Sequence, residues 1–223
     1  MPLDVRQLFE KQTYLAVSTV QKHLLSLVRL YPQDSEDKRF IHKLYREIIP
    51  ISIVAEAVGA KRIRFTNDKT DPDNSFDGIL EFHDGTRQIV ECTSAAQGHQ
   101  KKGKFGFLFH EIPFMRFFLS PHAVKHPLDE TPEPERPRYP GFRRRMIRAI
   151  TKKIKKNNAS YKGAWLIVTT NYPWMAFSQQ EKVLPPGFLK HQFKTFSRLF
   201  VLTPEGRLKL NIVLDYTPSI KLK

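Results

Sequence analysis

Asp77 and Glu91 are the residues of this sequence whose type and spacing best suit chemistry. They lie on two short apolar segments, 76–82 and 86–93, on either side of a turn, His83-Asp84-Gly85. A three-residue turn with a left-handed glycine pairs positions whose numbers sum to 168, which sets Asp77 opposite Glu91. Two opposed carboxylates repel each other unless a cation lies between them, and Mg²⁺ binds carboxylate oxygens. This hairpin therefore predicts a metal site that could activate water for attack on a phosphodiester.

The register of the hairpin decides whether the two carboxylates can cooperate. The three-residue turn sets Ile79 against Ile89 and Glu81 against Arg87, which are favourable cross-strand pairs. A two-residue turn would instead give a sum of 169 and would direct one of the two carboxylates to the other face of the sheet. We therefore prefer the register that brings the carboxylates together.

A helix before the hairpin could supply a third acid. Apolar positions at helical spacing run from about Asp37 to Gly59, with Glu56 near the C-terminal end and a kink expected at Pro50. A simpler interpretation of the three acids remains open. In that interpretation the aspartate only begins a strand, the hairpin glutamate pairs with a lysine, and Glu56 is solvated.

Helices and strands alternate on both sides of the hairpin. We expect helices up to residue 30, over 37–59 and over 142–158, and strands over 62–65, 164–170, 199–203 and 207–214. A helical connection between strands favours an α/β sheet with helices on both sides. Residues 121–140 contain six prolines, which predicts a mobile loop.

The order of these elements resembles the PD-(D/E)XK nuclease superfamily, which has the restriction-endonuclease-like fold. The resemblance covers about residues 39–170 and consists of Glu56 on a helix, then Phe76-Asp77-Gly78-Ile79-Leu80, Ile89-Val90-Glu91-Cys92-Thr93, a helix and an apolar strand. It implies a mixed central sheet flanked by helices. Residues 37–223 would form this nuclease-like domain, and residues 1–36 an additional N-terminal helical extension.

The resemblance also implies a catalytic site. In that superfamily Asp77 and Glu91 would bind Mg²⁺ or Mn²⁺, the carbonyl of Cys92 would be a further ligand, and Glu56 would assist. A lysine usually follows two residues after the glutamate, where this sequence has Thr93. Thr93 can donate a hydrogen bond but carries no charge. Three other lysines could occupy the space beside the glutamate: Lys61, Lys101 and Lys104.

Positive charge is concentrated after the proline-rich segment. The chain has 37 Lys and Arg against 22 Asp and Glu, a net charge of +15, and residues 141–163 contain no acid. Such a helix can simply be a solvated face, but uncompensated charge favours salt-sensitive contact with phosphates. The candidate contacts are Arg143, Arg144, Arg145, Arg148, Lys152, Lys153, Lys155 and Lys156, with Lys101 and Lys104 on the preceding loop.

The sequence thus predicts a cytoplasmic, Mg²⁺-dependent nuclease that acts on DNA. One alternative is a nuclease-like protein that binds nucleic acid without cutting it. Another is an interaction module whose aromatic segment, residues 105–118, docks on a protein partner or on a second copy in a homodimer. A single cysteine excludes an internal disulfide and fits a reducing compartment. No run of about 18 apolar residues occurs, so we expect no membrane partner.

Overall fold

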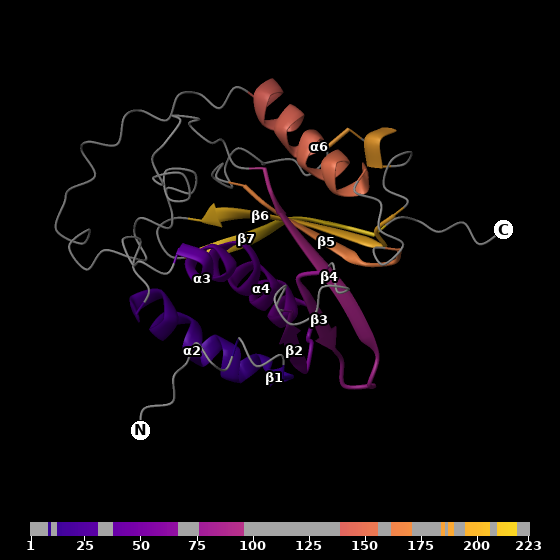
Figure 1. The fold of residues 1–223 in the computed structure, drawn as a ribbon. Coiled ribbons are helices and arrows are strands. Elements are labelled where there is room, and N and C mark those ends of the chain that lie inside the picture. Colours follow the sequence, from indigo (N-terminus) through magenta and orange to yellow (C-terminus); the bar gives the residue numbers. More distant parts are fainter. Residues whose placement is uncertain are drawn as a thin grey trace.

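The computed structural model of the chain describes residues 9, 13–30, 38–66, 76–95, 139–155, 162–170, 184–185, 187–189, 195–205 and 209–217. These residues form a seven-stranded mixed sheet with helices on both faces, which confirms the α/β class (Figure 1). The strands lie in chain order: β1 (Leu15–Ala16), β2 (Arg62–Phe65), β3 (Gly78–Glu81), β4 (Arg87–Ser94), β5 (Trp165–Thr169), β6 (Arg198–Glu205) and β7 (Lys209–Tyr216). Strands β4, β5 and β6 are parallel, and the other neighbours are antiparallel.

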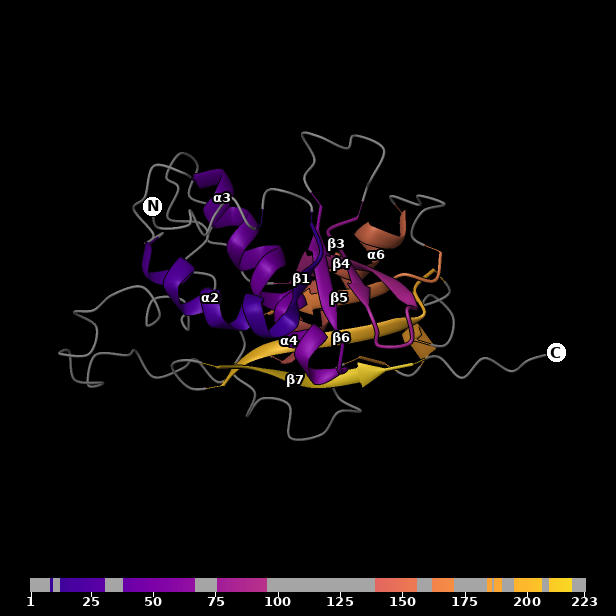
Figure 2. The same ribbon diagram turned by 90° about the horizontal axis from the view of Figure 1, so that it is seen from below.

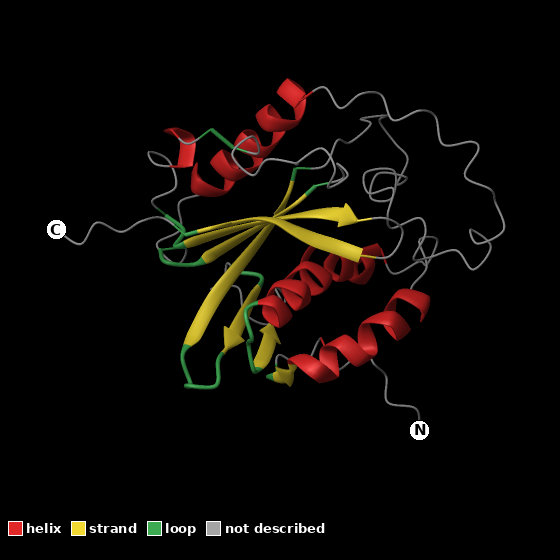
Figure 3. Cartoon of the chain, turned by 180° about the vertical axis from the view of Figure 1, so that it is seen from behind, coloured by secondary structure: helices red, strands yellow, loops and turns green. Residues whose placement is uncertain are grey.

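The helices form a layer on each side of this sheet. One layer contains α2 (Val17–Leu30) and a continuous run of α3 (Lys38–Lys43), the π-helical turn η1 (Leu44–Ile48) and α4 (Ile49–Ala57). These helices lie side by side in Figure 2, and the side chain of Gln21 on α2 donates to the carbonyl of Ser52 on α4 at 3.1 Å. Helix α6 (Tyr139–Lys155) covers the other face and connects β4 to β5 (Figure 3).

Alternation along the central strands divides the buried residues into two cores. On β5, Ile167 packs with the N-terminal helices, whereas Leu166 and Val168 pack with Met146 and Ile150 of α6. A strand between two helical layers must be apolar on both sides. The prediction that residues 164–170 form such a strand is therefore confirmed.

The N-terminal segment belongs to the same core as the rest of the sheet. Leu15 pairs with Ile63 at the edge of the sheet, and Val20 and Leu27 of α2 are fully buried in the core of the N-terminal helices. The structure therefore packs the described part of residues 1–36 against the domain rather than apart from it.

Two prolines lie at the beginning of helices. Pro50 opens α4 directly after η1. A proline ring clashes with the carbonyl four residues before it, and the wider π turn directly before Pro50 lets the helical run continue through this position. Pro140 lies in the first turn of α6, where its missing N–H costs nothing, so this helix begins three residues earlier than predicted.

Several sequence predictions fall outside the described residues. They concern Lys101, Lys104, Lys156, the aromatic segment 105–118 and the proline-rich loop as far as residue 138. The remaining predicted strands are present with small shifts at their ends.

Candidate metal and nucleic-acid site

The β3–β4 hairpin has the predicted register. Ile79 pairs with Ile89 and Glu81 with Arg87, so the numbers sum to 168. The turn contains three residues, because the N–H of Phe82 donates to the carbonyl of Thr86 at 2.9 Å. Gly85 has φ +82°, the left-handed conformation that this turn requires. The hairpin therefore directs Asp77 toward the segment of β4 that contains Glu91.

The regular pairing of the hairpin stops at Gly78, so that Asp77 is the first residue of this segment outside it. The last regular pair is Gly78 with Val90, and beyond it the N–H of Asp77 still donates to the carbonyl of Val90 at 3.2 Å. The Asp77 carboxylate then takes the place of a backbone acceptor, because its Oδ2 accepts the N–H of Cys92 at 2.6 Å. This bond fixes the aspartate beside Glu91–Cys92 at the point where the two strands separate.

Glu91 forms an ion pair with Lys153 of α6. The glutamate side chain is almost completely buried, at 2% exposure, and its Oε1 accepts a hydrogen bond from the Lys153 ammonium, which is 18% exposed. Burial of a carboxylate in this way requires a partner, because an isolated buried charge is strongly unfavourable. Helix α6 thus brings a lysine ammonium to the Glu91 carboxylate.

Cys92 lies among charged side chains of three elements. The thiol is buried, and this burial is the main reason why its pKa lies well above the usual value. The carboxylates of Asp77, Glu47 and Glu91 raise that pKa further, and the Lys153 ammonium lowers it. Asp77, Glu47, Glu91 and Lys153 therefore all lie within electrostatic reach of one thiol on β4.

The structure places the other predicted site residues in different surroundings. Glu56 is exposed at the C-terminal end of α4, and Lys61 is exposed at the start of β2. Thr93 is half-buried on β4, and by alternation its side chain lies on the same face as that of Glu91. The structure therefore brings together Asp77 and Glu91, with Thr93 on the same face, but not Glu56.

The donor set fits a hard cation that retains outside ligands. Over the described ranges, no three Asp, Glu, His or Cys side chains converge closely enough to hold a metal ion by themselves. Mg²⁺ typically binds one or two carboxylates and completes its shell with water and phosphate oxygens. Asp77, Glu91 and the carbonyl of Cys92 match that pattern.

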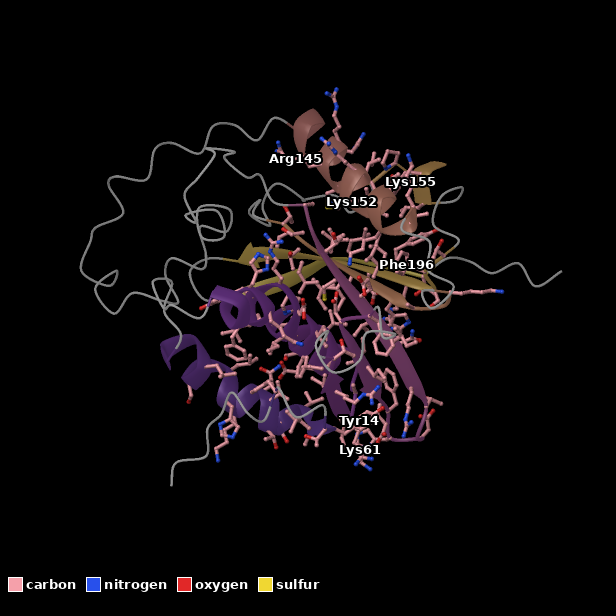
Figure 4. The ribbon with its side chains drawn as sticks, viewed as in Figure 1. Tyr14, Lys61, Arg145, Lys152, Lys155 and Phe196 are labelled. Carbon is pink, nitrogen blue, oxygen red and sulfur yellow. The ribbon has the colours of Figure 1, made fainter. Side chains whose placement is uncertain are left out.

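The basic residues of α6 divide into two groups. Arg144, Arg148, Lys152 and Lys155 are exposed and recur at intervals of three or four residues, so they form one stripe along the helix. Figure 4 shows Lys152 and Lys155 on this helix, with Arg145 toward its other end. The remaining described members are partly buried: Arg143, Arg145 and Lys153. Burial lowers the pKa of Arg145, which still remains protonated at neutral pH.

From the sequence, Lys153 was predicted only as a phosphate contact of the basic helix, and Glu47 was missed. Lys153 lies seven residues after Met146 and three after Ile150, both fully buried, so it is a charged residue on the apolar side of the helix. That position was a usable signal, because a lysine facing a core needs an acid. Glu47 lies on the helix predicted over 37–59, nine residues before Glu56, the candidate acid on that helix.

Comparison of the chain with protein-family models, with curated proteins and with solved structures found no match. Among the described helices, none combines the length and the apolar character that crossing a bilayer requires. The functional interpretation consequently depends on the geometry of Asp77, Glu91 and Lys153.

Proposed function

We propose that this chain is a Mg²⁺-dependent nuclease acting on DNA, with a site of the PD-(D/E)XK type at the end of the β3–β4 hairpin. One observation carries the proposal: Lys153 of α6 reaches Glu91, beside the Asp77 carboxylate that is fixed on Cys92. This supplies the aspartate, the glutamate and the ammonium of such a site, although the ammonium comes from a helix and not from β4.

Asp77, Glu91 and the carbonyl of Cys92 are the groups that would hold the ion. When bound, Mg²⁺ or Mn²⁺ supplies a Lewis acid that activates water and offsets charge on the phosphate. The chain contributes the fixed position of the oxygens. The aspartate is held by a backbone hydrogen bond, and the glutamate by burial between β4 and α6.

Lys153 would act on the phosphodiester itself. Its ammonium is mostly buried, so it is held in place and interacts with charge more strongly than a lysine in water. With a phosphodiester at the site, the ammonium can donate to a non-bridging oxygen as negative charge develops there. The exposed basic stripe of α6 would bind neighbouring phosphates without reading the sequence.

The restriction-endonuclease-like fold is part of the same proposal. Support comes from the order of α4, the β3–β4 hairpin, α6 and β5, which matches the order that suggested the superfamily. The parallel pairing of β4 with β5 around a helical connection is also compatible with it.

Cleavage of plasmid and single-stranded DNA with Mg²⁺, Mn²⁺ or EDTA tests the proposal. We expect metal-dependent cleavage by the natural chain and none by Asp77→Asn, because asparagine keeps the acceptor for the Cys92 N–H but loses the charge. Asp215→Asn on the distant strand β7 is the matched control and should cleave normally. Salt-sensitive binding without cleavage under any metal would contradict the proposal. It would support the simpler interpretation, in which the ion pair of Glu91 is structural and the protein only binds nucleic acid.

A further inference from the structure

Three arginines surround one tyrosine on the strands next to the proposed site. The guanidinium carbons of Arg62 and Arg64 lie 5.7 Å from the centroid of the Tyr14 ring, and that of Arg87 lies 5.3 Å from it. These distances are within the range of cation–π attraction. We call Tyr14, Arg62, Arg64 and Arg87 the Tyr14 cluster. Figure 4 shows Tyr14 beside Lys61, at the far end of the molecule from α6.

The charge of the Tyr14 cluster is only partly balanced. Glu81, whose side chain is 7% exposed, forms ion pairs with both Arg62 and Arg87. Arg64 forms no ion pair within the described part of the chain, and its Nε is buried without a hydrogen-bond acceptor there. Among the described residues, one carboxylate therefore pairs with two of the three guanidinium groups of the cluster. Guanidinium groups suit phosphate particularly well, because their planar N–H groups can bind two oxygens at once.

The Tyr14 cluster lies on the same face of the sheet as the two carboxylates. Ile63 and Phe65 of β2 pack in the core of the N-terminal helices, so Arg62 and Arg64, which alternate with them, point to the opposite face. On β4, residues 87, 89, 91 and 93 share that face, and Ile89 packs with the core of α6. Arg87 is therefore on the side of Glu91, about 13 Å away at about 3.3 Å per residue.

This face remains accessible to a ligand within the described part of the chain. Among the described helices, α2, α3 and α4 cover the opposite face, and α6 lies over the β4–β5 side of the sheet. The side chains of Arg62 and Arg87 are 44% and 63% exposed, although Glu81 between them is buried. An anion approaching this face would meet guanidinium groups before it met the carboxylate.

We propose that the Tyr14 cluster binds the phosphodiester backbone of a DNA strand that also passes Asp77 and Glu91. The cluster contacts phosphates about 13 Å from the one that is cleaved. The ring of Tyr14 holds the three guanidinium groups together, so that a phosphate meets them already ordered. That the bound strand is also cleaved rests on the proposed nuclease function. Binding of the strand by the Tyr14 cluster does not depend on that function.

Fluorescence anisotropy with a labelled single-stranded DNA in EDTA tests this binding without cleavage. Arg87→Gln and Arg64→Gln should each weaken binding about tenfold, the loss expected for one charge-assisted hydrogen bond. Each should also reduce the slope of log K against log salt by about 0.7. Tyr14→Leu should weaken binding less and leave that slope unchanged, since it removes no charge. Lys22→Gln is the matched control, because Lys22 is exposed on α2 on the other face.

The outcomes separate this inference from the proposed function. If the two arginine variants bind as the natural chain does, or lose no more than Lys22→Gln, the inference is wrong even where Mg²⁺-dependent cleavage is observed. If they bind more weakly with the reduced slope but no metal supports cleavage, the phosphate contact stands and the nuclease function fails. Absence of DNA binding by the natural chain would contradict both. Thermal unfolding of Arg87→Gln, which alters an exposed side chain, checks that the loss does not come from misfolding.

Discussion

The hairpins β3–β4 and β6–β7 belong to one sheet, but Glu91 of the first and Asp215 of the second are neutralised in different ways. On β7, Asp215 accepts two hydrogen bonds from Arg198 of the neighbouring strand, at 2.7 and 2.6 Å, and this aspartate is 41% exposed. On β4, Glu91 is buried and takes its cation from a helix 62 residues further along the chain. The Asp215 carboxylate has its cation on the neighbouring strand of the same hairpin. The Glu91 carboxylate has its cation on a separate helix, so a bound metal ion could take the place of that ammonium.

The two hairpins also differ in how far their pairing extends. The β6–β7 pairing extends from Leu199–Tyr216 to Glu205–Lys209, with one irregularity between Val201 and Leu202. Its arginine is also held by aromatic rings, with the guanidinium carbon 4.8 Å from the Trp165 centroid. The β3–β4 pairing stops at Gly78, which frees the next side chain to leave the ladder. Strand β7 is therefore paired with β6 along its length, whereas β3 and β4 separate beside the two carboxylates.

Replacing Lys153 should cause the largest loss of stability among the variants proposed for the two hairpins. Lys153→Met leaves the buried Glu91 carboxylate without its ammonium, which should lower the free energy of unfolding by about 3–5 kcal/mol. Urea denaturation measures the loss. Lys152→Met, on the exposed stripe, is the control and should stay within about 0.5 kcal/mol. Adding Glu91→Gln to Lys153→Met should recover much of the stability. Equal, small losses at both lysines would show that the ion pair is not important for folding.

Moving the lysine from α6 to β4 tests whether an ammonium beside Glu91 contributes to cleavage. Lys153→Met should reduce Mg²⁺-dependent cleavage by about 10²-fold or more, the usual cost of removing one group that stabilises charge in the transition state. Thr93→Lys in the same background places an ammonium on β4, on the face of Glu91, and should restore part of the cleavage rate. Steady-state cleavage of a labelled DNA measures both variants at protein concentrations where each is folded. A rate that Lys153→Met leaves unchanged would exclude this lysine from catalysis.

A substitution in the β3–β4 turn should have a smaller effect on stability, and it leaves the β6–β7 hairpin unaltered. Gly85 has φ +82° and an added Cβ would have open space, so Gly85→Ala should cost only the left-handed conformation, about 1–2 kcal/mol. Gly85→Asn should cost less, because asparagine adopts this conformation more readily. Thermal unfolding compares the two variants. If alanine and asparagine lose the same stability, the conformation of Gly85 does not determine the stability of this hairpin.

The smallest effect is expected on the other hairpin. Asp215→Asn removes a partly exposed ion pair and should cost about 0.2–1 kcal/mol, less at high salt. Urea denaturation at low and high salt measures this loss. A cost as large as that of Lys153→Met would remove the distinction between the two ion pairs.

The local part of this structure could be predicted from the sequence. The register of β3–β4 follows from the pairs Ile79–Ile89 and Glu81–Arg87 together with a glycine at the left-handed position. These determinants lie within a few residues of each other, so no tertiary information was needed.

The long-range part could not be predicted in the same way. Any of many basic residues could neutralise Glu91, and the choice depends on how α6 docks over β4. The periodicity of the helix over 37–59 was recognised, but it does not say which of its turns approaches Cys92, so Glu47 was missed. Leu15 fits a helical pattern, yet it pairs as an edge strand because β2 offers it a partner.

The distance along the chain between Glu91 and Lys153 has a consequence for folding. The β3–β4 hairpin can form early, because its contacts are local, but its glutamate cannot be buried without the ammonium on α6. During synthesis, residue 153 follows long after residue 91. The Glu91 carboxylate therefore remains hydrated until α6 packs over it, so any activity of this site depends on the docking of this helix.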